Sequence, residues 1–164
     1  MRLPVRRMLF CAVALVAVLG FGARSASAQT YTLTAALTGA QENPSINTGA
    51  FGSATVVVDM GARTVTYRVD VYNLPSGVTA SHIHAGAITT NGPVVVNFAP
   101  PVPASNDFGF SGTVRDTEFV LRPDQGIRSA DDMFQAILGE NSYVNVHSTV
   151  NPGGEIRGQL LLKK

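Results

Sequence analysis

The order of apolar and polar positions along this chain is mostly that of β-strands. Residues 31–38, 50–59 and 63–72 alternate with a period of two, which places successive side chains on opposite faces of a sheet. Shorter stretches of strand character span residues 79–85, 94–98, 108–115, 117–121, 143–148 and 155–160. Turns rich in glycine, proline and asparagine separate them. About eight or nine short strands in succession predict an all-β fold, a Greek-key β-sandwich or barrel.

One segment departs from the period of two and predicts a short helix over residues 129–138. Its apolar residues recur at the spacing of one helix face: Ala130, Met133, Phe134, Ile137 and Leu138. Ser129 is a suitable N-cap with Asp132 three residues later, and Gly139 is a suitable C-terminal stop. We expect this helix to close one end of the core.

The first 28 residues have the features of a cleaved signal peptide. A basic start is followed by an apolar run over residues 8–22 and by the small residues Ala26-Ser27-Ala28. A membrane anchor is the alternative, but this run is shorter than the roughly 20 residues that span a bilayer. We therefore expect export to the periplasm or the extracellular space, no membrane attachment after cleavage, and a single domain over residues 29–164.

The cysteine count and the charge narrow the function further. The only cysteine is Cys11, inside the leader, so we expect a mature protein without disulfides or thiolate ligands. The leader carries four of the twelve basic residues and no acidic one, so eight basic residues face eleven acidic ones, a net charge of −3. The charges are scattered, and this argues against nucleic acid or a membrane surface as the partner.

The mature chain contains three histidines, and the alternation places all of them on the outer face of the sheet. Ile83 is the apolar member of its stretch, so His82 and His84 share the opposite face. In the C-terminal hairpin the valines at 144 and 146 should face the core, which turns His147 outward. Three imidazoles on rigid strands suit zinc or copper and leave a coordination position open. The alternative is that these rings only hydrogen-bond backbone carbonyls or neighbouring side chains.

Asn145, Glu155 and Arg157 fall on the same predicted face as the histidines, so we expect them to surround any metal. Two interpretations of Glu155 and Arg157 stay open at this stage. They form a surface ion pair worth under about 1 kcal/mol, or Glu155 accepts a hydrogen bond from a histidine ring and orients it.

Three motifs in this chain resemble those of the CHRD domain, named for its repeats in the animal protein chordin. They are Gly39-Ala40-Gln41-Glu42-Asn43-Pro44, Ser81-His82-Ile83-His84-Ala85-Gly86 and the hairpin from Tyr143 to Gln159 with its Asn-Pro-Gly-Gly turn. The resemblance covers residues 31–161. It implies an immunoglobulin-like β-sandwich that is distantly similar to copper-zinc superoxide dismutases, in a family with no established activity.

The same resemblance relates His82 and His84 to the paired copper ligands of those dismutases. The chain lacks the further histidines and the aspartate of their zinc site, and it lacks the cysteines of the family disulfide. A dismutase activity is therefore not carried over, and His147 is the remaining candidate ligand.

Three functions follow from these observations. The first is a non-catalytic, extracytoplasmic binding or interaction module for a protein or small ligand not identified by the sequence. The alternative is a copper- or zinc-binding protein that uses His82, His84 and His147. An enzyme at the same site ranks last, because no nucleophile, general base or substrate pocket is identifiable. No catalytic residue is predicted.

Overall fold

The computed structural model describes residues 29–101 and 105–164, so the predicted signal peptide lies outside the described residues. The described residues form nine strands and one α-helix. The strands are β1 (Thr30–Thr38), β2 (Phe51–Asp59), β3 (Thr64–Tyr72), β4 (Val78–Ala85), β5 (Val94–Asn97), β6 (Phe108–Arg115), β7 (Ser142–Ser148), β8 (Ile156–Gln159) and β9 (Leu161–Leu162). The helix is α1 (Ala130–Leu138), and the 3-10 turns are η1 (Gly39–Gln41), η2 (Asp116–Glu118) and η3 (Pro123–Gln125).

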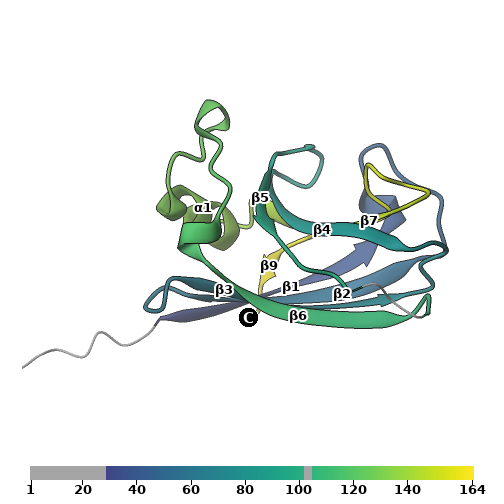
Figure 1. Ribbon diagram of the computed structural model, residues 1–164. Helices are drawn as coiled ribbons and strands as arrows, with labels where there is room; N and C mark the ends of the chain where they lie inside the picture. Colours follow the sequence, from purple (N-terminus) through teal and green to yellow (C-terminus); the bar gives the residue numbers. More distant parts are fainter. Residues whose placement is uncertain (1–28, 102–104) are drawn as a thin grey trace, which may run out of the picture.

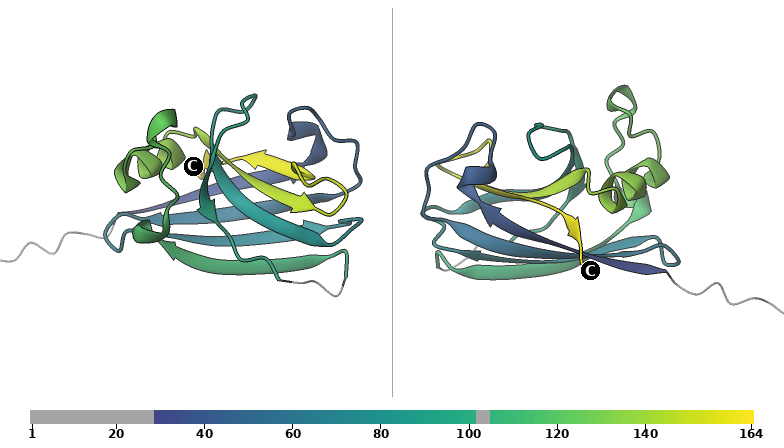
Figure 2. Two further views of the ribbon diagram at one scale, coloured as in Figure 1. Left: turned by 45° about the horizontal axis from the view of Figure 1, so that its top comes forward. Right: turned by 180° about the vertical axis from the view of Figure 1, so that it is seen from behind.

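The strands form one antiparallel sheet that folds over on itself into two layers (Figures 1 and 2). Its order is β5-β4-β7-β8-β1-β2-β3-β6, with β9 added to β1. The layers meet where β8 touches β1, through the single register pair of Arg157 with Thr38. After β3 the chain crosses to the other layer for β4, and β6 later returns to pair with β3. The predicted all-β sandwich with one short helix is confirmed.

The core lies between the two layers and is built by the predicted alternation. In the layer of β1, β2, β3 and β6 the inward side chains are fully buried, as Leu33, Val56 and Val69 illustrate. From the other layer Ile83 and Val144 meet them and are equally buried. Each such side chain contributes about 1.5–3 kcal/mol by leaving water, which fixes the face that each strand turns inward.

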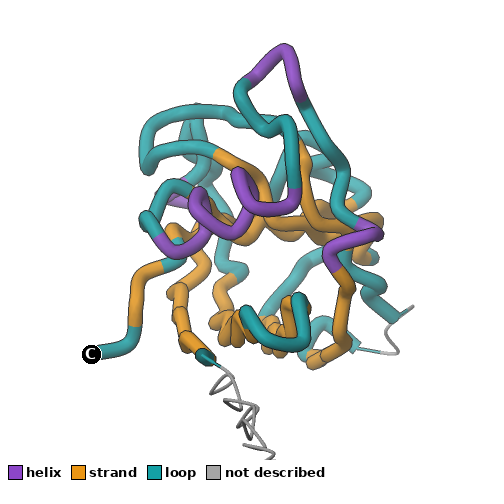
Figure 3. The backbone as a smooth tube through the Cα atoms, turned by 90° about the vertical axis from the view of Figure 1, so that its left-hand side faces the viewer, coloured by secondary structure: helices purple, strands orange, loops and turns teal. Residues whose placement is uncertain are grey.

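Helix α1 covers one end of the sandwich, which is turned toward the viewer in Figure 3. Met133, Phe134 and Ile137 are fully buried along one side of the helix. The Ser129 hydroxyl accepts a hydrogen bond from the Asp132 amide at 3.1 Å, which confirms the predicted N-cap. None of the described helices is long and apolar enough to cross a membrane.

The predicted strand at residues 117–121 is wrong. The chain turns locally there, because the Glu118 carboxylate accepts from the Arg115 amide at 2.9 Å and the Phe119 amide bonds back to Asp116. Phe119 packs edge-to-face on Phe134 of α1, with ring centroids 5.3 Å apart. Phe119 thus packs on the helix, and only the Val120 amide bonds to the sheet edge, at the Val95 carbonyl of β5.

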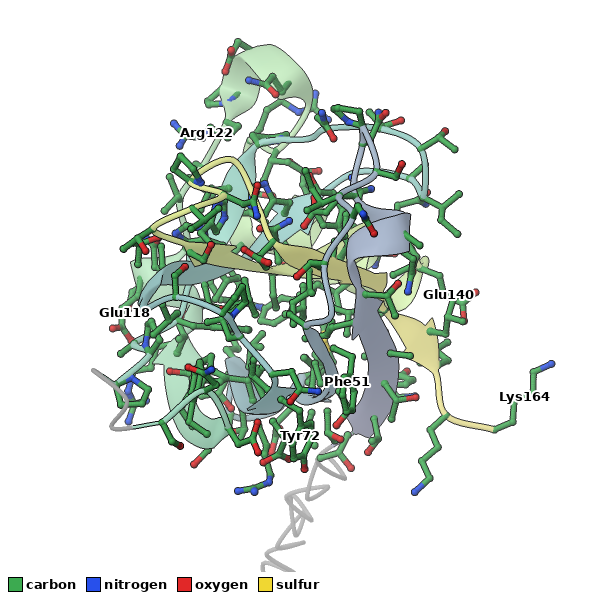
Figure 4. The ribbon with its side chains drawn as sticks, turned by 90° about the vertical axis from the view of Figure 1, so that its right-hand side faces the viewer. Phe51, Tyr72, Glu118, Arg122, Glu140 and Lys164 are labelled. Atoms are coloured by element: carbon green, nitrogen blue, oxygen red, sulfur yellow. The ribbon has the colours of Figure 1, made fainter. Side chains whose placement is uncertain are left out.

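The outer faces of the two layers differ. On the layer of β2 and β3, the stacked rings of Phe51 and Tyr72 lie 47% and 43% exposed (Figure 4). In the other layer every residue of β7 and β8 is buried, whether its side chain points to the inner or the outer face of the sheet. The connections at residues 39–50, 86–93 and 149–155 rise on this side and cover it (Figure 1). The face predicted to carry the histidines is therefore enclosed by loops.

Candidate metal centre

Strands β4 and β7 bring the three histidines together. They pair antiparallel, with His82 opposite Asn145 and His84 opposite Tyr143. Ile83 points into the core, so the two flanking rings share the outer face with His147. One ring nitrogen from each histidine lies within 4.8 Å of the other two, and His82 Nδ1 is 3.2 Å from His147 Nε2. The sequence placed the three histidines on one face but did not show whether they meet. In the structure the three rings converge.

Backbone carbonyls fix the protonation of two of the rings. His84 Nδ1 lies 2.9 Å from the Gly92 carbonyl oxygen, and His147 Nδ1 lies 2.9 Å from that of Pro152. A carbonyl only accepts, so both Nδ1 atoms carry the proton and both Nε2 atoms present a lone pair. Such carbonyl contacts are the usual partners that orient metal-binding histidines.

The lone pair of His84 has no partner among the described residues. Its Nε2 atom is buried and makes no hydrogen bond. Nearby, His82 Nδ1 faces the lone pair of His147. A buried acceptor without a donor costs free energy comparable to a lost hydrogen bond. His82 Nδ1 can donate to the lone pair of His147, so His84 Nε2 is the one ring nitrogen of the cluster that is buried without a partner.

Burial keeps the imidazoles uncharged. Desolvation, with the positive potential of His147 and His84, lowers the pKa of His82 to about 4. Desolvation also lowers the pKa of His84 and of His147, against the opposing effect of their carbonyl hydrogen bonds. Neutral imidazole is the form that binds metal ions, so the three rings are in that form at neutral pH.

These residues fit a copper or zinc ion. Two imidazole nitrogens on a tetrahedral ion at 2.0–2.1 Å lie about 3.3–3.4 Å apart, and the His82–His147 separation of 3.2 Å agrees with this. The other separations, up to 4.8 Å, require only small ring movements. A set made of nitrogen donors alone suits zinc and copper better than magnesium or calcium, which prefer oxygen.

A stack of side chains stands beside His84. The Tyr143 ring lies parallel to the His84 ring, with centroids 4.9 Å apart and planes 7° apart. On its other face the Arg157 guanidinium carbon lies 3.4 Å from the ring centre. The Gly92 amide donates to the Tyr143 hydroxyl at 3.2 Å.

Glu155 and Arg157 do not form the predicted surface ion pair. Each is 1% exposed, and no ion pair joins them. The Glu155 carboxylate accepts hydrogen bonds from Thr48, Ser148 and Asn151 at 2.5–2.7 Å. Burial acts to raise the pKa of Glu155, but these bonds outweigh it and leave the pKa lowered. None of its hydrogen bonds reaches a histidine.

Asn145 also connects to a loop rather than to the histidines. Its amide donates to the Glu42 carboxylate at 2.8 Å. Desolvation raises the pKa of Glu42 to about 7, despite the lowering effects of this bond and of the Arg157 charge. Gly154 has a positive φ of 138° and packs tightly here, because a Cβ would lie 2.7 Å from a Glu42 oxygen. A half-open cavity of about 280 Å³ borders Glu42 and the turn at Pro152.

Sequence reasoning missed several residues that support the site. Gly92 and Pro152 act through backbone carbonyls, for which no side-chain signal exists. Tyr143 was placed on the correct face without a role. Glu42 lies in the Gln-Glu-Asn-Pro motif, which supported only the family resemblance.

The comparisons with known proteins agree with the motifs. Neither the curated proteins nor the solved structures include a match to this chain. The family model of the CHRD domain matches residues 33–160, which include nearly all of the sheet and the three histidines. The chain therefore belongs to the CHRD domain family.

Proposed function

We propose that this protein binds one transition-metal ion, copper or zinc, through His82, His84 and His147. The observation that carries the proposal is the buried, unpartnered Nε2 atom of His84 beside the close pair of His82 and His147 nitrogens. A structural histidine normally satisfies both ring nitrogens when it is buried. A bound metal would replace the proton shared between His82 and His147 and would give the lone pair of His84 a partner.

The ligand set also indicates what the ion would do. Three neutral imidazoles leave the full charge of the ion uncompensated and a coordination position open. The ion would act as a Lewis acid toward a ligand entering from solvent. The proposal includes export of the chain, because the first 28 residues have the features of a cleaved signal peptide. A site of imidazoles without cysteine suits the oxidising conditions outside the cytosol. Non-catalytic binding to a partner stays a prediction.

The test is metal binding by the purified protein after treatment with a chelator. We expect one Cu(II) or Zn(II) ion per chain by elemental analysis, with affinity measured by competition against a chromophoric chelator. His82→Ala, His84→Ala and His147→Ala should each weaken binding more than tenfold. Thr79→Ala, at an exposed position of the same strand, is the matched control and should bind like the wild type.

Two results would overturn the proposal. One is a wild-type protein that takes up neither ion at micromolar concentration. The other is a set of histidine variants that bind as much metal as the wild type. Circular dichroism of each variant separates loss of ligands from loss of fold, and metal-dependent thermal stabilisation gives a second readout, because a ligand that binds only the folded state raises the melting temperature.

A further inference from the structure

We propose that Arg157 is a positioning residue for this metal centre, and that it holds His84 by two routes, through Tyr143 and through the loop at residues 86–93. The inference rests on the proposed metal binding. It gives this buried cation a role beyond attaching the loop.

The burial of the Arg157 guanidinium costs free energy. Its side chain is 1% exposed, and among the described residues no carboxylate forms an ion pair with it. Burial of an unpaired cation costs several kcal/mol unless hydrogen bonds compensate it. The Glu42 carboxylate adds a Coulombic attraction. The direct contacts are with neutral groups, namely three carbonyl oxygens, the Asn91 side chain and the face of Tyr143. All of these belong to the surroundings of His84.

The first route runs through the loop. The Arg157 guanidinium donates to the carbonyls of Ala87, Ile88 and Thr90 at 2.9–3.2 Å. Two residues after the last of these, the Gly92 carbonyl accepts the His84 Nδ1 proton. Gly92 packs so closely on the end of β4 that a Cβ would lie 1.6 Å from a backbone oxygen. Fixing the loop therefore fixes the carbonyl that selects the tautomer of His84.

The second route runs through the rings. Arg157, Tyr143 and His84 form a continuous stack with separations of 3.4 and 4.9 Å. The Tyr143 hydroxyl accepts from the Gly92 amide, so the stack and the loop are tied to each other. The plane of the His84 ring is set by the stack, and its rotation in that plane is set by Gly92. Together they determine where Nε2 points.

Loss of Arg157 should therefore weaken metal binding without removing a ligand. Partners that orient metal-binding histidines typically account for about 10–100-fold in metal affinity. We expect Arg157→Met to lose affinity by a factor in this range. Arg157→Lys keeps the charge but not the planar fork of donors, and should recover only part of the loss.

The matched control is Ser129→Ala at the start of α1. The Ser129 hydroxyl accepts from the Asp132 amide, so this variant also removes a hydrogen bond that stabilises the fold, but none to the loop at residues 86–93, to Tyr143 or to a histidine. It should lower stability while leaving metal affinity within about threefold of the wild type, because sites without shared partners change each other's free energies by only a few tenths of a kcal/mol.

A readout in the metal-free protein makes the test independent of metal binding. In ¹⁵N NMR of the imidazoles, the wild type should show His84 as a single tautomer protonated at Nδ1. Arg157→Met should show a mixture of tautomers. If the wild type binds no metal, the proposed function fails while this measurement still tests the positioning.

Wild-type affinity and a single tautomer in Arg157→Met would overturn the proposal, and so would an equal loss of affinity in Ser129→Ala. If Arg157→Met does not fold, Tyr143→Phe replaces it. That variant keeps the stack but loses the bond to Gly92, so a smaller loss of affinity with a measurable second tautomer is expected. No change in either property would contradict the second route.

Discussion

Replacing Glu155 by glutamine should destabilise the fold and leave the metal centre intact. The carboxylate is buried, and it accepts from Thr48 on one oxygen and from Ser148 and Asn151 on the other. In Glu155→Gln one oxygen becomes an NH₂ group. The glutamine amide can turn its NH₂ group toward Thr48, whose hydroxyl can rotate to accept, and its oxygen then still accepts from Ser148 and Asn151 but without the charge.

The magnitude follows from these three bonds. A hydrogen bond to a charged group is worth about 1.5–3 kcal/mol, and one between neutral groups about 0.5–1.5 kcal/mol. All three bonds are weakened in this way, while relief from burying a charge offsets part of the loss. We expect the free energy of unfolding to fall by about 2–4 kcal/mol.

The assay is urea unfolding at pH 7.5, followed by circular dichroism, with the midpoint compared at an unchanged slope. Asp124→Asn, at an exposed carboxylate, is the control and should change stability by less than about 0.5 kcal/mol. Because the pKa of Glu155 is lowered in the folded state, its contribution exists above the unfolded pKa of 4.5 and should fade as the pH falls below it.

Two outcomes would refute this reasoning. Wild-type stability of Glu155→Gln would show that the three hydrogen bonds contribute nothing. Wild-type stability combined with a loss of metal affinity above tenfold would return Glu155 to the role of orienting a histidine, which its contacts do not support.

Three further predictions concern protonation and packing. The pKa of His82 is about 4, and those of His84 and His147 are also lowered. Metal affinity in a competition titration should therefore be within a few-fold at pH 6 of its value at pH 7.5. Three unperturbed imidazoles would lose about fiftyfold in affinity through protonation. The pKa of Glu42 rises from 4.5 to about 7 on folding, so the stability of the wild type should fall as the pH rises across that interval. In urea unfolding, Glu42→Gln should be more stable than the wild type by about 1–2 kcal/mol at pH 8, with no such gain at pH 4. Gly158→Ala should cost at least about 2 kcal/mol in the same assay, because its Cβ would lie 2.3 Å from the Ala36 carbonyl oxygen, whereas Gly153→Ala meets nothing within 4 Å and should be nearly neutral.

The face of the sheet on which the histidines lie was predictable, because it is a local property that depends only on the alternation within each strand. Alternation assigns a side chain to one face of its own strand, and the burial of Ile83 and Val146 shows that the assignment holds. The helix was predictable for the same reason. Its apolar spacing and its Ser129 cap both lie within ten residues of sequence.

The surroundings of the histidines were not predictable, because they depend on contacts between distant segments. Glu155 receives a hydrogen bond from Thr48, 107 residues earlier, and Asn145 donates to Glu42, 103 residues earlier. Alternation distinguishes the face turned toward the core from the other face, but it does not say whether loops cover the latter. A glutamate and an arginine two residues apart therefore suggested a surface ion pair, although each is buried with neutral partners.

The outer face of the terminal hairpin attaches loops, and this explains why its motif is so polar. Asn145 and Glu155 bind the connection at residues 39–50, while Arg157 binds the loop at residues 86–93. Gln159 binds the start of that same loop. His147 differs from these four, since its Nε2 atom faces another histidine rather than a loop. The fold thus uses four polar residues of one hairpin to secure the loops around a fifth, and this separates the residues that maintain the site from the one that would bind the ion.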